Sequence, residues 1–173
     1  MTHSSTDQFA ALYDATYSDV LRYVRRRADP LLVDDIVSET FAIAWRRRSS
    51  IPENARPWLF RTAANVVANA TRGQRRQLQI AIRIGDGGGI RAEADIEFDL
   101  IAAWRSLSRL DQEVLALHIW EDLAAPEAAI VLGCSRATYA MRLTRARRRL
   151  GALLTETELT WSATQRTPRE GTS

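Results

Sequence analysis

The sequence of 173 residues contains one cysteine and only two histidines. Because Cys134 is alone, it cannot form an internal disulfide or a cysteine-rich zinc site. Two histidines, one of them near the N-terminus, are too few for a histidine metal site or a nucleophilic triad. We therefore expect neither a metal ion nor a cofactor.

Long apolar runs and targeting signals are also missing. No stretch approaches the roughly 20 apolar residues that a membrane-spanning helix requires. The N-terminal segment MTHSSTDQFAALYD lacks the charged and then apolar pattern of a secretory signal. These absences predict a cytoplasmic chain with no membrane insertion. The hydrophobic share of 46% is nevertheless too high for a disordered protein.

Lysine is absent, so all 24 basic residues are arginines. This bias is typical of a GC-rich coding sequence, but the distribution of the arginines is more informative. Residues 1–80 hold twelve arginines against eight acids, residues 81–121 four against eight, and residues 122–151 six against two. Two basic segments that flank an acidic one indicate two contact points on one polyanion.

Apolar residues recur at three- and four-residue spacing along most of the chain, which predicts an all-α fold. Asp29 and Pro30 end the first helical segment, and Pro57 suits the first turn of a third. The glycine-rich segment 84–97 has no period and is typical of a flexible linker. We predict two small helical domains, at residues 8–80 and 99–154. A flexible linker at residues 81–98 joins them, and a disordered tail follows at residues 155–173.

Residues 126–150 predict a helix-turn-helix. Pro126 suits a first helical turn, Gly133 suits a left-handed turn, and Ser135 is a natural N-cap for the next helix. The second helix of such a motif normally lies in the DNA major groove. The expected duplex contacts lie near its start or away from its apolar face: Arg136, Thr138, Met141, Arg142, Arg145 and Arg148.

Other side chains of this helix have different expected roles. Arg147 and Arg149 are more typical of solvated or phosphate-contacting residues, and arginines here also favour the negative end of the helix dipole. Tyr139 and Cys134 are expected in the small core of the domain. A basic helix after a turn is only moderately specific for DNA, because many helix pairs resemble the motif.

Both halves of the chain together resemble bacterial RNA polymerase sigma factors of the extracytoplasmic-function group. The segment VDDIVSETFAIAWRR (33–47) looks like the acidic helix of that family, and RPWLFRTAANVVANATRGQRR looks like its following helix. The segments LSRLDQEVLALHIWEDL and PEAAIVLGCSRATYAMRLTRARRRL are similar to its C-terminal domain. The order of the two motif sets makes the resemblance more specific than either set alone.

The resemblance implies three functional surfaces. The acidic helix would dock on core RNA polymerase, the loop 49–56 and the following helix would bind the melted minus-ten strand, and the C-terminal helix would read the minus-thirty-five duplex of promoter DNA. The implied polymerase contacts are Asp34, Asp35, Val37, Glu39, Phe41 and Trp45. The implied contacts with the melted strand are Ser50, Asn54, Arg56, Trp58, Arg61, Asn65, Asn69 and Arg72. An anti-sigma factor is the further partner that the resemblance implies.

The sequence departs from the family pattern at several positions. Ala64 and Ala70 stand where basic side chains are frequent, which predicts weaker contact with the melted strand. Arg136, Ala140 and Met141 replace the frequent Val, Lys and Ser. We expect Met141 to contact a thymine methyl group and promoter choice to be unusual.

Alternative explanations exist for the same residues. Trp58 could be a buried structural residue, and acids near a helix start also favour the helix dipole. The chain could be a stand-alone helix-turn-helix regulator that binds duplex operator DNA. An enzyme that uses Asp34, Asp35 and Glu39 is disfavoured, because these side chains do not converge on one helix face.

Overall fold

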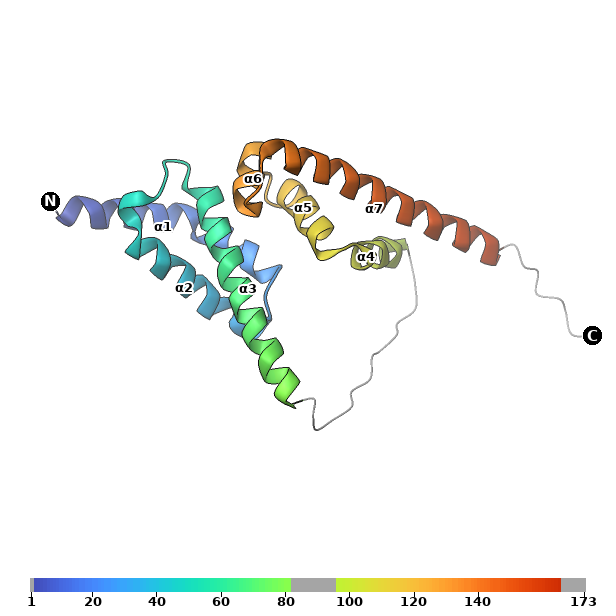
Figure 1. Cartoon of the computed structure of the whole chain (residues 1–173), viewed down its shortest axis with the longest axis horizontal. Coiled ribbons are helices and arrows are strands. Elements are labelled where there is room, and N and C mark those ends of the chain that lie inside the picture. Colours follow the sequence, from blue (N-terminus) through green and yellow to red (C-terminus); the bar gives the residue numbers. More distant parts are fainter. Residues whose placement is uncertain (1, 82–95, 166–173) are drawn as a thin grey trace, which may run out of the picture. The chain divides into compact units, whose positions relative to one another are not determined.

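The structure is a computed structural model that describes residues 2–81 and 96–165. Within these ranges the chain is entirely helical, which confirms the predicted all-α class (Figure 1). The helices are α1 (Thr2–Arg25), α2 (Val33–Arg46), α3 (Ala55–Ala81), α4 (Ile96–Ser106), α5 (Arg109–Ile119), α6 (Ala125–Leu132) and α7 (Arg136–Gln165). Short 3-10 turns at Pro30–Leu32 and Arg48–Ser50 flank α2.

The described helices form two compact units. The first unit contains α1, α2, α3 and α6, and the second contains α4, α5 and α7. Most of the predicted linker, residues 82–95, lies outside the described residues. Helix α7 continues to Gln165 and so extends into the segment 155–173, which the sequence predicts as a disordered tail. The tail residues 166–173 lie outside the described ranges.

The core of the first unit forms where the apolar faces of α1, α2 and α3 meet. Tyr23 of α1 stacks on Phe60 of α3 with a centroid distance of 4.7 Å, and both side chains are fully buried. Tyr13 of α1 meets Phe41 of α2 at 4.6 Å. Such aromatic pairs contribute about 0.5–1.5 kcal/mol each beyond the burial of their area. The aromatic contacts therefore fix α2 and α3 against α1.

The break between α1 and α2 arises from two neighbouring residues. Asp29 accepts a hydrogen bond from the backbone N–H of Leu31 at 3.0 Å, and Pro30 fixes the first residue of the 3-10 turn. The predicted break at Asp29 and Pro30 is confirmed.

A polar contact orients the start of α3, where the Arg56 guanidinium donates to the Asp19 carboxylate at 2.7 Å.

The second unit places α7 against α5. Tyr139 is 1% exposed, and its hydroxyl donates to the Val114 carbonyl at 3.1 Å. Its predicted place in the core is confirmed, whereas Cys134 is only half-buried. Ser108 caps α5 by accepting the backbone N–H of Asp111 at 3.1 Å. None of the helices in the described residues is long and apolar enough to cross a membrane.

Candidate nucleic-acid interface and polymerase-docking helix

The turn between α6 and α7 has the geometry that a helix-turn-helix requires. Gly133 adopts φ 63° and ψ 38°, a left-handed conformation that glycine adopts without strain. Its backbone N–H donates to the Ile130 carbonyl at 3.2 Å, and that of Cys134 donates to the Ala129 carbonyl at 3.0 Å. These bonds satisfy the last carbonyls of α6, so the chain turns and begins α7 at Arg136.

The residues of α7 divide between an inner and an outer side. Tyr139 and Ala146 are buried, as the apolar spacing predicted. Of the six predicted duplex contacts, Arg136, Met141, Arg145 and Arg148 are exposed, and Thr138 and Arg142 are half-buried. No carboxylate of the described residues pairs with the four arginines of this set. The outer side of α7 therefore carries positive charge that is available for a polyanion.

Two further arginines of α7 point to α5 instead. Arg149 donates to the Asp111 carboxylate at 2.6 Å, and this carboxylate also accepts the Ser108 hydroxyl at 2.8 Å. Arg147 contacts the Nε2 atom of His118. Arg147 and Arg149 therefore brace α7 on α5. Helical spacing could not identify these partners, because they lie on a different helix.

We expect Arg149→Ala and Arg145→Ala to have different effects. Removing the Arg149 guanidinium should lower the free energy of unfolding by about 1 kcal/mol, since its partner is buried but Arg149 itself is largely exposed. Base preference in the upstream promoter element should not change. Removing Arg145 should weaken promoter binding by about 1–3 kcal/mol without changing the melting temperature. Thermal unfolding and promoter binding by the assembled polymerase test this contrast. An equal loss of promoter binding in Arg149→Ala and Arg145→Ala would contradict it.

The predicted melted-strand contacts of α3 follow one helical stripe. Trp58, Arg61, Asn65, Asn69 and Arg72 recur at three- and four-residue spacing on this helix. The asparagines and both arginines of the stripe are exposed, and Trp58 is half-buried. Arg72 donates to the Asn69 side chain at 2.6 Å. Donors, acceptors and one aromatic ring thus share a face, which suits an unpaired nucleic-acid strand.

Other predicted contacts are engaged within the first unit. Arg56 is held by Asp19, so it orients the start of α3 as an internal ion pair. Asn54 donates to the Glu127 carboxylate at 2.7 Å, and Arg61 donates to the Ile130 carbonyl at 2.8 Å. Ser50 is exposed, and its hydroxyl donates to the Arg47 carbonyl at 2.9 Å.

Helix α2 presents acids on its outer side and apolar residues on its inner side. Asp34, Asp35 and Glu39 are exposed, and Glu39 pairs with Arg46 at 2.9 Å. Within the described residues, no cation pairs with Asp34 or Asp35, and no cluster of three potential metal ligands exists. The two aspartates therefore offer free negative charge.

The apolar residues expected to contact polymerase on α2 differ in exposure. Val37 is 3% exposed and Phe41 is 5% exposed, so both belong to the core of the first unit. They face inward because they lie on the stripe that packs on α1 and α3. Trp45 is 38% exposed; its ring forms a T-shaped pair with Phe9 at a centroid distance of 5.0 Å, and the Arg48 guanidinium lies over it at 4.3 Å from the ring centroid.

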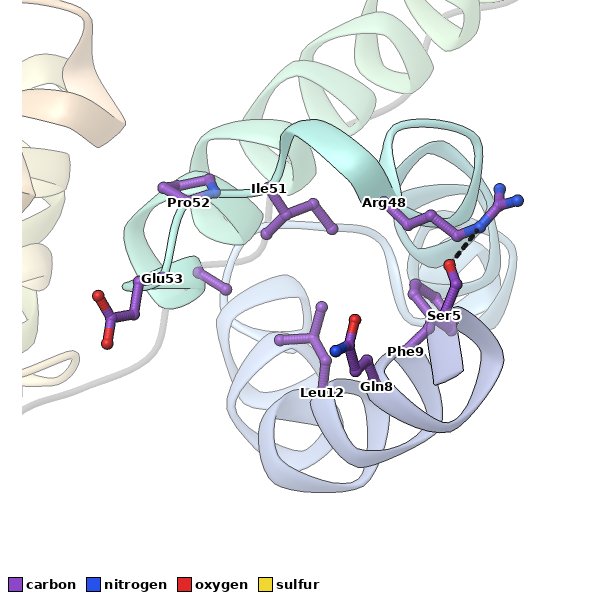
Figure 2. Close-up of a pocket in the computed structure, with 9 residues that line it drawn as sticks. Ser5, Gln8, Phe9, Leu12, Arg48, Ile51, Pro52 and Glu53 are labelled. Carbon is purple, nitrogen blue, oxygen red and sulfur yellow. Dashed lines mark hydrogen bonds between the residues drawn. The ribbon is translucent and has the colours of Figure 1, made fainter. Parts of the chain in front are cut away.

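A pocket of about 510 Å³ lies between the start of α1 and the loop that follows α2 (Figure 2). Its residues are Ser5, Gln8, Phe9, Leu12, Arg48, Ile51, Pro52, Glu53 and Ala55. The contribution of Ser5 and Gln8 was missed from sequence. No signal in the sequence could have found it, because Ser5 lies 43 and Gln8 lies 40 positions before Arg48, the first residue of the loop that lines the pocket.

Family models match both halves of the chain. The model of Sigma-70 region 2 matches residues 12–77, and the model of Sigma-70, region 4 matches residues 98–150. RNA polymerase sigma factor NccH of Alcaligenes xylosoxydans xylosoxydans is 31% identical over 140 residues, which cover 73% of this chain and 75% of NccH. ECF RNA polymerase sigma factor SigM of Bacillus subtilis is 27% identical over 150 residues, which cover 82% of this chain and 92% of SigM.

Solved structures show the same architecture. CnrH, in complex with the cytosolic domain of CnrY, matches with a TM-score of 0.62 and 26% identity, over 87% of this chain and 90% of CnrH. Sigma factor RpoE, in complex with the anti-sigma factor NepR from Bartonella quintana, matches with a TM-score of 0.66 over 86% of this chain and 97% of RpoE. Its identity is 23%, so it supports the fold alone.

An acidic helix, a polar stripe on α3 and an arginine-rich α7 fit the general class of nucleic-acid-binding proteins with more than one contact surface. The family matches are more specific: the chain belongs to the extracytoplasmic-function group of RNA polymerase sigma factors. It therefore binds core RNA polymerase and directs promoter-specific transcription initiation. The alternative of a stand-alone regulator is not favoured.

Proposed function

We propose that three surfaces of this sigma factor divide its work. Asp34, Asp35 and Glu39 on α2 dock on core polymerase, the stripe of α3 with the loop 49–56 binds the melted minus-ten strand, and the outer side of α7 reads the minus-thirty-five duplex. The observation that carries the proposal is the outer side of α7, where Arg136, Arg142, Arg145 and Arg148 have no acidic partner among the described residues. Because a duplex presents closely spaced phosphates, this charge favours a DNA partner.

The functional domains are residues 8–80 and 99–154, and the ranges of the two family models support these boundaries. The protein acts in the cytoplasm as an initiation factor and has no catalytic activity of its own. This assignment is supported by the membership of its family among transcription initiation factors.

The experiment is in vitro transcription by core RNA polymerase with and without this chain. The template is a promoter library with randomised minus-ten and minus-thirty-five elements. We expect transcripts from a defined subset of promoters only when the chain is present. Tight binding to duplex DNA without polymerase, and no promoter-specific transcript with it, would instead indicate a stand-alone regulator.

We also propose an anti-sigma factor as the regulatory partner. CnrH, at 26% identity, was solved with the cytosolic domain of CnrY, which supports a protein partner for a chain of this fold. Co-purification of a bound protein that inhibits transcription in the assay above tests this proposal.

Met141 provides a test of how α7 reads DNA. Its side chain is 46% exposed, and an exposed thioether offers apolar contact to a thymine methyl group. We expect Met141→Ser to reduce the preference for thymine at one upstream position by a few-fold, and Met141→Leu to retain it. Promoter selection from the randomised library measures both. Identical upstream preferences in Met141→Ser and the wild type would contradict the contact.

A further inference from the structure

The C-terminal end of α1 carries a cluster of arginines that none of the three proposed surfaces includes. Arg22, Arg25 and Arg26 are exposed. The backbone N–H of Arg26 donates to the Arg22 carbonyl at 3.3 Å, which continues the helical geometry one residue beyond α1. Because Arg25 and Arg26 follow Arg22 by three and four positions, the three share one side of the helix, the α1 arginine face. No acid occurs between Asp19 and Asp29, so the charge of this segment is positive throughout.

Polar and aromatic contacts hold this end of α1 against the start of α3. The Asp19 carboxylate accepts a hydrogen bond from Arg22 through Oδ1 and another from Arg56 of α3 through Oδ2. The Tyr23 ring stacks on the Phe60 ring, and the Arg56 guanidinium lies 5.0 Å from the centroid of Phe60. Since two guanidinium groups share one carboxylate, Arg22 lies directly beside Arg56.

The shared carboxylate leaves this place with net positive charge. Asp19 supplies one negative charge against the two positive charges of Arg22 and Arg56, and Arg25 and Arg26 add to the excess. The Arg22 side chain is 59% exposed despite its ion pair, and a guanidinium has five N–H donors, more than one ion pair engages. A guanidinium that is held in place and still exposed suits a further oxyanion, because its planar fork of donors matches a phosphate.

The position of the α1 arginine face favours a DNA backbone over an acidic protein. Arg56 is among the residues of the segment 49–56 that we propose to bind promoter DNA, and Arg22 lies next to it. DNA bound by that segment carries one negative charge per nucleotide, so its phosphates come within reach of α1.

A purely structural role for the same arginines makes a different prediction. Arg22 and Arg25 stand in the last turn of α1, where cations favour the negative end of the helix dipole. That effect stabilises the fold without DNA and leaves the salt dependence of promoter binding unchanged. A phosphate contact instead releases counterions from DNA and therefore contributes to that salt dependence.

We propose that the α1 arginine face binds the sugar-phosphate backbone of promoter DNA next to the melted element. The inference rests on the proposed function, and it adds α1 to the surfaces that contact the promoter. Asp19 positions Arg22 beside Arg56, and the arginines of α1 make the contact. Because phosphates are the same in every sequence, this surface supplies affinity and no base preference.

The test is promoter binding by the assembled polymerase over a series of salt concentrations, with the double variant Arg22→Gln/Arg25→Gln. Each phosphate contact contributes about 0.7–0.9 to the slope of the logarithm of affinity against the logarithm of salt concentration. We expect the slope of the double variant to be smaller by about 1.5 and its affinity at low salt to be lower by about tenfold. Its base preferences in the randomised library should equal those of the wild type.

Two further variants separate a phosphate contact from a change in fold or in net charge. Arg22→Lys/Arg25→Lys keeps both charges and should keep most of the slope. Arg105→Gln/Arg109→Gln removes two exposed arginines of the second unit, so it changes the net charge equally and should retain the slope of the wild type. Thermal unfolding should show all three double variants to be folded.

A wild-type slope in the folded Arg22→Gln/Arg25→Gln variant would overturn the inference. If that variant also bound core polymerase more weakly in a pull-down titration, the α1 arginine face would contact an acidic protein surface and not DNA. Absence of selective promoter binding by polymerase assembled with the wild type would refute the proposed function itself, and the inference with it.

Discussion

Polymerase assembled with the double variant Asp34→Arg/Asp35→Arg should give about one hundredfold less promoter-specific transcript than polymerase assembled with the wild type. Both aspartates are exposed at the start of α2, and no cation of the described residues neutralises them. Opposed charges across an interface attract, whereas like charges placed opposite each other cost several kcal/mol. A loss of about 3 kcal/mol in core binding corresponds to roughly a hundredfold in affinity.

Stability must be separated from docking in this variant. Acids in the first turn favour the helix dipole, so their reversal should lower the free energy of unfolding by about 1 kcal/mol. Asp14→Arg is the matched control, because it reverses one exposed acid of α1 outside the proposed surface. We expect it to bind core polymerase like the wild type in a pull-down titration. Wild-type affinity of the folded double variant would remove α2 from the docking surface.

Local chemistry made parts of this molecule predictable from sequence. The Asp29 and Pro30 break and the left-handed Gly133 depend on properties of single residues, and both occur as expected. The burial of Tyr139 follows from helical spacing alone. These features need no knowledge of which helices meet.

Features that depend on a second helix were not predictable. Arg149 and Arg147 belong to a run of three arginines, and only α5 distinguishes them from Arg148 by supplying Asp111 and His118. Arg56 likewise acquires an internal role from Asp19, thirty-seven residues earlier. Sequence spacing shows which residues share a face of one helix but not what that face meets.

Family motifs also mix contact residues with core residues. Val37 and Phe41 occupy the acidic-helix motif together with Asp34 and Asp35, yet Val37 and Phe41 are buried whereas the two aspartates are exposed. An α-helix with one side in a core and one side in solvent places both kinds of residue within a single turn. The surface proposed for docking on polymerase therefore consists of the exposed acids of α2 and not of the whole motif.

Replacing Tyr139 with alanine should cause the largest loss of stability, about 3–5 kcal/mol. The ring is buried between α7 and α5. Its removal therefore leaves a cavity and removes the hydrogen bond that joins α7 to the Val114 carbonyl of α5. Tyr139→Phe keeps the ring and loses only the hydroxyl bond to Val114, which should cost about 1 kcal/mol. Met141→Ala, on the outer side of the same helix, should change stability by less than about 0.5 kcal/mol.

The consequence for function follows from the place of Tyr139 beneath the outer arginines of α7. Without its anchor α7 no longer presents Arg142 and Arg145 in a fixed orientation, so recognition of the minus-thirty-five element should be lost in Tyr139→Ala and retained in Tyr139→Phe. Hydrogen exchange measures the loss of the fixed orientation of α7. We expect faster exchange in α4, α5 and α7 and unchanged exchange in α1–α3. Transcription from promoters with and without the upstream element measures the loss of recognition. Slow exchange in α5 and α7 of Tyr139→Ala would show that other contacts hold α7 in place.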